Sequence, residues 1–494
     1  MLEYIRQEAN MTKTENGAAA YESSGSCCLD LFATIGALRR EDDEEIICRF
    51  IRAYTENSDM AMKLLFFARD VRGGLGERRV FRAIFNWLAS NEPASAMKNM
   101  EYVPDYGRFD DLLSLMGTPC EKAMLALLKL GFEKDMAAMK QGGSVSLLAK
   151  WLPSVNTSKP ETRAMGRKIA RAFGLSDAEY RRSLSALRAK IRILENNLRE
   201  RDYSFDYEKQ PSRALFKYKK AFIRNDRERY CAFIDAVSSG EMRLHAGNIA
   251  PYELVEPYLG GYRYRHGFMR DITPEEKAVL NATWSALPDY GGEENAIAVI
   301  DTSGSMYCDS NPLPAAVALS LGIYFAERNK GMFANCFIEF SARPQLIELK
   351  GESFADRLRY AASFNEIGNT NLEAVFMLIL NAAVKNKAAQ SELPAKIIII
   401  SDMEFDACVN NTSALIFRNV RKSYEVCGYK LPQVVFWNAA SRHRQQPVRE
   451  NEQGVALVSG VTPRLFSMLA GGVVSPYSLM LEVLESERYA RIAA

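Results

Sequence analysis

The stretch AIAVIDTSGSM, residues 296–306, decides the fold of the C-terminal part of the chain. Its first six residues form a short apolar run rich in isoleucine and valine, which predicts a buried β-strand that ends at Asp301. Ser303 and Ser305 follow in a D-x-S-x-S pattern, and Gly304 between them lets the backbone bend. Ligands of open α/β sheets bind outside the carboxyl ends of the strands. The pattern therefore predicts a loop that presents one carboxylate and two hydroxyls at that edge.

Strand-like and helical stretches alternate from residue 293 to residue 490, and we take this range as one domain. Such alternation predicts a mostly parallel, doubly wound sheet of the Rossmann-like α/β class. The second and third strands are so close in sequence that we expect a hairpin and one antiparallel edge strand. The expected strands are 296–301, 333–342, 345–350, 396–402, 433–439 and 454–460. The expected helices are 313–329, 354–362, 371–387, 412–427, 463–470 and 476–490.

Two later positions extend the loop into a candidate metal site. Asp402 ends the isoleucine-rich strand in KIIIISD, and Thr370 in IGNTNLEAVF lies at a loop-to-helix junction. If the two strands are neighbours, Asp301 and Asp402 lie side by side. Carboxylate, hydroxyl and water oxygens are the ligands that Mg²⁺ prefers. The sequence predicts one divalent cation, Mg²⁺ first with Mn²⁺ or Ca²⁺ as alternatives, bound by Asp301, Ser303, Ser305, Thr370 and Asp402.

The same residues resemble the metal-ion-dependent adhesion site of von Willebrand factor A domains, whose motif is D-x-S-x-S, then a Thr, then an Asp. The resemblance implies a strand order of 3-2-1-4-5-6 with an antiparallel edge strand. It also implies a metal with an exchangeable position for a partner's acidic group. The alternative interpretation is that D-x-S-x-S only caps a strand-to-helix turn. We expect the nearby acids Glu404 and Asp406 to be solvated loop residues, with a supporting role at the metal as the alternative.

The N-terminal half has a different pattern. Residues 1–26 are small and polar and predict a frayed, disordered tail. Apolar residues at three- and four-residue spacing, with Gly and Pro breaks between the units, predict helices throughout residues 27–288. Helix after helix without strands indicates an α-helical repeat domain, a HEAT-like solenoid that could close into a ring.

Four segments of this half resemble an uncharacterised family, domain of unknown function 2828, found with a C-terminal von Willebrand factor A domain. They are ARDVRGGLGERRVFR (68–82), VPDYGRFDDLL (103–113), LLAKWLPSVNTS (147–158) and YRRSLSALRAKIRILENNL (180–198). That family is distantly similar to the TROVE module of Ro ribonucleoproteins, in which a ring of helical repeats binds RNA. The resemblance therefore implies RNA binding.

Positive charge is concentrated in one region. Residues 150–229 contain 21 Lys and Arg against 10 Asp and Glu, although the whole chain carries only +2. Aromatic residues are interleaved, and cations beside rings are typical of single-stranded RNA binding. The alternative is that the rings form the core and the cations the solvated face. The candidate RNA-binding residues are Arg181, Arg182, Arg188, Lys190, Arg192, Arg213, Lys217, Lys219, Lys220 and Arg224.

The remaining composition narrows the class of protein. No apolar run has the length of a membrane span or a signal peptide, so we expect a cytoplasmic protein. The nine cysteines are scattered and lack zinc-site spacing, so we expect reduced thiols. The three histidines lack catalytic spacing, so we expect no enzyme.

Our leading hypothesis is a Ro-like protein that binds single-stranded or structured small RNA, in RNA quality control or as a ribonucleoprotein scaffold. The runner-up is a protein-interaction scaffold whose bound Mg²⁺ captures an acidic residue of a partner. A third is a Mg²⁺-dependent phosphodiesterase, in which the single cation with its two aspartates assists phosphoryl chemistry.

Overall fold

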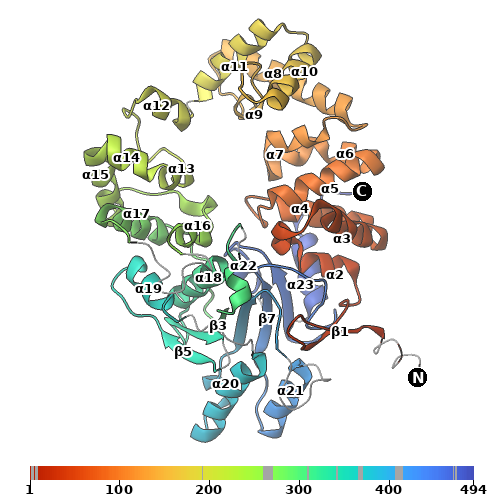
Figure 1. Cartoon of the computed structure of the whole chain (residues 1–494), viewed down its shortest axis with the longest axis vertical. Coiled ribbons are helices and arrows are strands. Elements are labelled where there is room, and N and C mark those ends of the chain that lie inside the picture. Colours follow the sequence, from red (N-terminus) through yellow and green to blue (C-terminus); the bar gives the residue numbers. More distant parts are fainter. Residues whose placement is uncertain are drawn as a thin grey trace.

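The structure, a computed structural model, describes residues 1, 5, 9–191, 193–259, 271–308, 311–340, 343–364, 371–406, 416–470, 472 and 475–494. Figure 1 shows two parts: an α/β domain built around one sheet, and a long array of helices that leaves this domain on one side and returns to it on the other. Both parts have the class of fold that the sequence predicts.

The α/β domain contains one six-stranded sheet in the order β5-β4-β3-β6-β7-β8. All neighbouring pairs are parallel except β4 and β5, which are antiparallel. Numbered within the domain, this order is 3-2-1-4-5-6 with an antiparallel edge strand, so the predicted topology is confirmed. The strands are β3 (Ala296–Asp301), β4 (Cys336–Phe340), β5 (Gln345–Glu348), β6 (Lys396–Ser401), β7 (Gln433–Asn438) and β8 (Val455–Ser459).

Helices cover both faces of this sheet because its central strands are apolar on both sides. Ile297 and Val299 of β3 belong to one buried cluster, whereas Ala298 and Ile300 belong to another that continues into the helical array. The described helices of the domain are η6 (Gly304–Tyr307), α18 (Pro314–Arg328), α19 (Phe354–Ala361), α20 (Leu372–Asn386), η7 (Gln390–Glu392), α21 (Ile416–Val426), α22 (Leu465–Met468), α23 (Pro476–Leu484) and η8 (Glu487–Tyr489).

The helical array begins with a compact group that packs pairwise around apolar faces. In α3, for example, the Asp42 side chain accepts from the amide of Glu45 at the N-terminus, and Ile46, Phe50 and Ala53 form the buried stripe. The group contains α2 (Cys27–Phe32), η1 (Ile35–Arg40), α3 (Asp43–Glu56), α4 (Ser58–Arg69), α5 (Arg78–Asn91), α6 (Pro93–Asn99), η2 (Met100–Tyr102), α7 (Val103–Tyr106) and η3 (Phe109–Leu115).

Two further groups continue the array away from the sheet and back toward it (Figure 1). The distant group contains α8 (Glu121–Lys140), α9 (Leu148–Trp151), α10 (Pro160–Phe173) and α11 (Asp177–Ile191). The returning group contains α12 (Leu194–Glu200), α13 (Ser212–Lys217), α14 (Lys219–Asn225), α15 (Arg227–Ser238), η4 (Ala246–Asn248), α16 (Pro251–Val255), η5 (Glu256–Tyr258) and α17 (Pro274–Ser285).

The array and the α/β domain together form a closed ring. On one side α2 and η1 contact β8 and α23, and on the other α16 and α17 contact α18 and α19. The two ends of the array also meet each other, because the Arg39 guanidinium lies 5.7 Å from the centre of the Tyr252 ring. Arg464 of the α/β domain donates to the carbonyl oxygens of Val71 and Gly247, one from each end.

The residues that follow the last strand also join the α/β domain to the first group of helices. Arg488 and Tyr489 both donate to the buried carboxylate of Asp70, which follows α4. Further along, Asn99 of α6 exchanges hydrogen bonds with the backbone of Ala493. A segment that follows the α/β domain in sequence thus packs on the first group of helices.

The N-terminal residues differ from the prediction of a disordered tail over residues 1–26. Residues 11–21 form an antiparallel hairpin of β1 (Met11–Lys13) and β2 (Ala19–Tyr21), and Tyr21 bridges to Gln446 of the α/β domain. The small side chains that suggested disorder instead allow close packing, since Ala18 and Ala20 are only 1% and 2% exposed. Within the described part of the chain, none of the helices has both the length and the apolar character needed to cross a membrane.

Candidate metal centre

The adjacent parallel strands β3 and β6 end in polar residues at the same edge of the sheet. Ile300 pairs with Ile400, so Asp301 at the end of β3 and Asp402 just beyond β6 are neighbours. Their exposed fractions are only 1% and 3%. Two aspartates that lie about a hundred positions apart in the chain are therefore brought together in a buried place, as the sequence predicted.

The D-x-S-x-S loop turns its polar atoms toward one region. The backbone amide of Ser303 donates to Oδ1 of Asp301 at 2.9 Å, and the hydroxyls of Ser303 and Ser305 lie 3.0 Å apart. The second oxygen of Asp301 accepts a hydrogen bond from the hydroxyl of Ser401 at 2.5 Å. The carboxylate of Asp301, itself a predicted metal ligand, thus holds the loop in place.

The electrostatics of the pair favour an added positive charge. Burial, followed by the negative charge of Asp402, raises the pKa of Asp301 to about 7. Among the described residues, Arg442 supplies a cation to this pair: its Nη2 lies 3.0 Å from Oδ2 of Asp402. A buried pair of carboxylates with two converging hydroxyls is a hard-oxygen donor set, which fits Mg²⁺ or a similar divalent ion. Thr370, the remaining predicted ligand, lies outside the described residues.

Glu404 is not the solvated loop acid that we expected, because only 1% of it is exposed. The N-terminal hairpin covers it: the amide of Glu15 donates to Oε2 at 2.7 Å, and the side chain of Gln445 donates to Oε1 at 2.8 Å. Burial consequently raises the pKa of Glu404. Asp406 is partly buried, and Gly17 of the hairpin forms a bridge with it.

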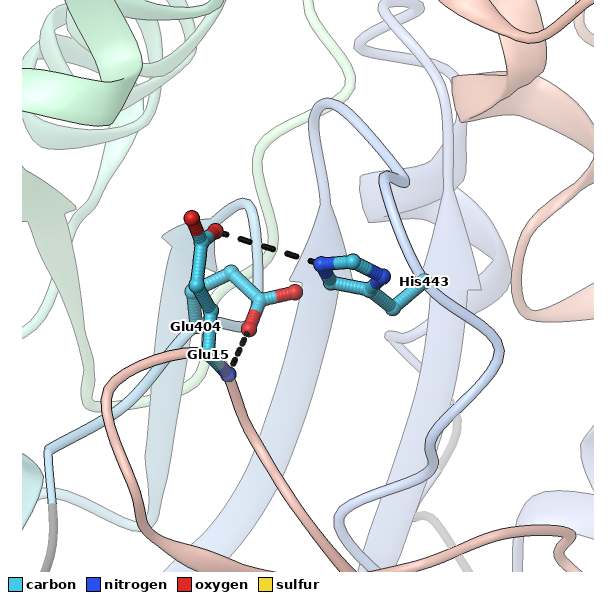
Figure 2. A group of neighbouring side chains, drawn as sticks. All are labelled: Glu15, Glu404 and His443. Atoms are coloured by element: carbon cyan, nitrogen blue, oxygen red, sulfur yellow. Dashed lines mark hydrogen bonds and ion pairs between the residues drawn. The ribbon is translucent and has the colours of Figure 1, made fainter.

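Figure 2 shows the side chains of Glu15, Glu404 and His443 gathered in one place, and Glu404 lies two positions after Asp402 in the sequence. One ligand atom from each lies within 4.8 Å of the other two, a spacing at which three groups can hold a metal ion. Both oxygens of Glu404 already accept hydrogen bonds, however, and Arg442 pairs with Glu15 at 2.9 Å. Because the carboxylates of Glu404 and Glu15 already have these partners, we interpret the trio as a hydrogen-bonded cluster.

Nine of the ten cations proposed for RNA binding lie within the described residues, and they fall into two groups. Seven are exposed: Arg181, Arg182, Lys190, Arg213, Lys217, Lys220 and Arg224. Two of these seven form salt bridges, Arg213 with Glu253 at 2.8 Å and Lys220 with Glu276 at 3.8 Å. Arg192 lies outside the described residues.

The remaining two cations are structural. Arg188 donates to the carbonyl oxygens of Ala149 and Leu152 and to the hydroxyl of Ser154, at 2.8, 2.6 and 2.7 Å. Lys219 is 6% exposed, and its Nζ lies 3.8 Å from the centre of the Phe216 ring. These two residues point inward because α11 and α14 use their long side chains to join neighbouring segments.

The interleaved aromatic residues mostly belong to the core. Tyr207, Phe216 and Phe222 are 4%, 7% and 0% exposed, and the first and third pack ring against ring at 5.4 Å. Tyr203, Phe205 and Tyr218 are partly buried against the same core. They do not form a stacking platform for bases, since helical spacing placed them between helices.

Three residues at the site were missed by the sequence analysis: Ser401, Arg442 and Glu15. Ser401 could have been found because it directly precedes Asp402 at the end of the strand. Arg442 lies in the basic run SRHR just after β7, the strand next to β6. Glu15 gave no signal, since its place depends on a contact between segments 389 positions apart.

The fold and the site define a class: a closed helical array that carries an α/β domain with paired aspartates at the carboxyl edge of its sheet. The sequence matches the Domain of unknown function (DUF2828) over residues 14–125 and 126–290, more than half of the chain, and the chain belongs to that family. Residues 295–483 match a second family, Domain of unknown function (DUF7788).

One relative and one solved structure are similar over nearly the whole chain. Uncharacterized protein L728 of Acanthamoeba polyphaga mimivirus is 28% identical over 515 residues, covering 97% of this chain and 88% of the relative. The crystal structure of the Deinococcus radiodurans RO (RSR) protein is 12% identical with a TM-score of 0.33, covering 95% of this chain and 100% of that one. A TM-score this low supports no conclusion about the family, so the family assignment depends only on the match to the family model.

Proposed function

We propose that the α/β domain is a von Willebrand factor A-type binding domain that holds one divalent cation, Mg²⁺ in the first instance, and that it has no catalytic activity. The supporting observation is the buried pair Asp301 and Asp402 at the ends of neighbouring strands, with the hydroxyls of Ser303 and Ser305 3.0 Å apart beside them. Thr370 is the fifth residue that would hold the ion.

The residues of the proposed metal site would have different roles. Asp301 and Asp402 would supply the negative charge, and the two serine hydroxyls would supply neutral oxygens. The two carboxylates balance the charge of a divalent ion, and bound Mg²⁺ usually keeps exchangeable waters. When bound, the ion would supply a Lewis-acidic position for the carboxylate of a partner. Ser401 would keep Asp301 oriented through the hydrogen bond described above.

A metal titration tests this proposal. Mn²⁺ binding, followed by electron paramagnetic resonance, should show one site in the full-length protein, and Mg²⁺ should compete for it. Asp301→Asn should abolish the site, whereas Glu425→Gln, a change of an exposed acid on α21, should leave it intact. Mn²⁺ binding that survives Asp301→Asn would place the ion elsewhere and end the proposal.

We propose RNA binding by the helical array as a second function, which would fit a role in RNA quality control or as a ribonucleoprotein scaffold. The observation in its favour is the exposure of cations on α11, α13 and α14, of which Arg181, Arg182, Lys217 and Arg224 form no salt bridge among the described residues. Without the stacking platform, these residues would contact phosphates and read little sequence.

Salt dependence and charge removal test the second function. Binding of a single-stranded or structured small RNA should weaken steeply with salt, and changing Arg181, Arg182, Lys217 and Arg224 to Gln should lower the affinity and the salt slope. Lys385 and Lys422 of the α/β domain, changed in the same way, provide the control. Equal RNA binding by both variants would exclude this surface. Cleavage of the RNA that depends on Asp301 would instead indicate a phosphodiesterase.

A further inference from the structure

We propose that Arg442 and His443 form a carboxylate-binding subsite beside the metal centre, and that Glu15 of the N-terminal hairpin fills this subsite within the chain. The partner that fits is an acidic peptide segment with two carboxylates, one for the metal and one for the subsite. This inference rests on the proposed function of the metal centre and adds the chemistry of its ligand.

The guanidinium of Arg442 joins the metal centre to Glu15. Its Nη2 lies 3.0 Å from Oδ2 of Asp402, and its Nη1 lies 2.9 Å from Oε2 of Glu15. His443 adds a ring nitrogen 3.9 Å from the same Glu15 oxygen (Figure 2). The planar fork of an arginine suits two carboxylates at once. The side chain of Arg442 therefore binds Asp402 of the metal centre with one nitrogen and Glu15 with the other.

The hairpin presents Glu15 from a fixed backbone. At its tip Thr14 donates to the carbonyl oxygen of Phe405 at 2.5 Å, and Asn16 donates to the carbonyl oxygen of Glu404 at 2.7 Å. These bonds and the amide of Glu15 attach the tip to the two residues that follow Met403. The side chain of Glu15 is nevertheless 52% exposed. Its carboxylate can therefore leave Arg442 without disturbing the backbone that carries it.

Charge explains why an acid on Arg442 and a metal at Asp402 would act together. A divalent cation coordinated by Asp402 reduces the attraction between that carboxylate and the guanidinium. The charge of Arg442 is then balanced mainly by its second acid. Glu15 supplies that acid at high local concentration because it belongs to the same chain. A partner's second carboxylate must displace Glu15, which makes the hairpin an internal competitor.

The neighbouring arginine of the same loop offers a matched comparison. Arg444 lies two positions further along, but its guanidinium pairs with Glu45 of α3 and not with the site. Glu22 is likewise an exposed acid of the hairpin segment, and its backbone amide bonds to Asn10. Changes at these two positions alter the charge of the loop and hairpin without touching the contact between Glu15 and Arg442.

The test measures binding of a fluorescent triglutamate peptide to the full-length protein in Mg²⁺ by anisotropy. Glu15→Gln keeps the backbone hydrogen bond to Glu404 and removes the competing charge, so it should bind the peptide roughly five- to tenfold more tightly than the wild type. Adding Arg442→Gln should cancel this gain, and Arg442→Lys, which keeps the charge and loses the fork, should cancel it in part. Glu22→Gln and Arg444→Gln should match the wild type.

Mn²⁺ binding by the same variants separates this inference from the proposed function. If Mn²⁺ binds normally and Glu15→Gln gains no affinity for triglutamate, the subsite is refuted and the metal centre stands. A gain that persists without Arg442 also refutes the subsite. If the wild type binds no Mn²⁺, both proposals are refuted together.

Discussion

The guanidinium of Arg188 donates to three oxygens of residues 149–154, so this cation joins α11 to the segment that contains α9. Its exposed neighbour Arg181 lies on the same helix. Two arginines that look equivalent in a basic run thus have opposite surroundings. At the scale of single residues, the burial of the helix face decides whether a cation can meet a phosphate or must satisfy carbonyl groups.

This contrast predicts different effects for two similar substitutions. Arg188→Gln should lower the free energy of unfolding by about 2–3 kcal/mol, because it removes several charge-assisted hydrogen bonds to buried oxygens. Arg181→Gln, at an exposed position, should change it by less than about 0.5 kcal/mol. Urea unfolding followed by circular dichroism would measure both. Equal stability of the two variants would contradict the structural role of Arg188.

At the scale of elements, η1 lies against the end of β8 at the join between the helical array and the sheet. The amide of Gly36 donates to the hydroxyl of Ser459 at 3.0 Å, and that hydroxyl donates to the carbonyl oxygen of Phe32. A Cβ on Gly36 would lie 2.6 Å from the carbonyl oxygen of Ser459. The approach of the two backbones thus requires glycine at this position.

Gly36→Ala should therefore separate η1 from β8. Because the colliding atoms are backbone atoms, we expect a loss of about 1–3 kcal/mol in the free energy of unfolding. Gly292→Ala is the control, since its nearest contact would be an ordinary 3.9 Å. Thermal unfolding by calorimetry compares the two, and a Gly36→Ala protein as stable as the wild type would show that the contact is not as tight as the structure has it.

The elements themselves were largely predictable from local patterns, whereas their contacts were not. The strand 296–301 and the helices around residues 314–328 and 476–484 follow from apolar runs and caps. The sheet order was implied by the resemblance to von Willebrand factor A domains, and it places Asp301 beside Asp402. The hairpin at residues 11–21 could not, because its small residues acquire order only by packing on a distant loop. Burial of Glu404 and inward turning of Arg188 depend on the same kind of long-range contact.

At the scale of the whole molecule, ion pairs connect the helical array to the loops of the sheet. Glu45 of α3 accepts from Arg444, which follows β7, and also from Arg49 of its own helix. The hydrogen bond from Arg444, followed by that from Arg49, lowers the pKa of Glu45 to about 2. The contact between the two parts of the ring is therefore sensitive to acid.

The sign of this sensitivity follows from linkage. A carboxyl whose pKa is lower in the folded protein stabilises it fully above its ordinary value of 4.5, and this contribution is lost as the pH falls toward about 2. The difference in thermal midpoint between the wild type and Glu45→Gln should shrink over that range. Arg444→Gln removes the partner with the larger effect and leaves Arg49, so it should lose most of this pH-dependent part. A difference that stays constant with pH would contradict the assignment.

The attachment of Arg488 and Tyr489 to Asp70 has a consequence for how the protein is made. The ribosome produces Asp70 418 residues before Arg488. During most of translation, Asp70 and the surface around it therefore lack Arg488 and Tyr489, the residues that cover them in the folded protein. The contacts that join the two ends of the array to the α/β domain form only after the sheet has been synthesised, so until then the ring lacks the part of its closure that this domain supplies.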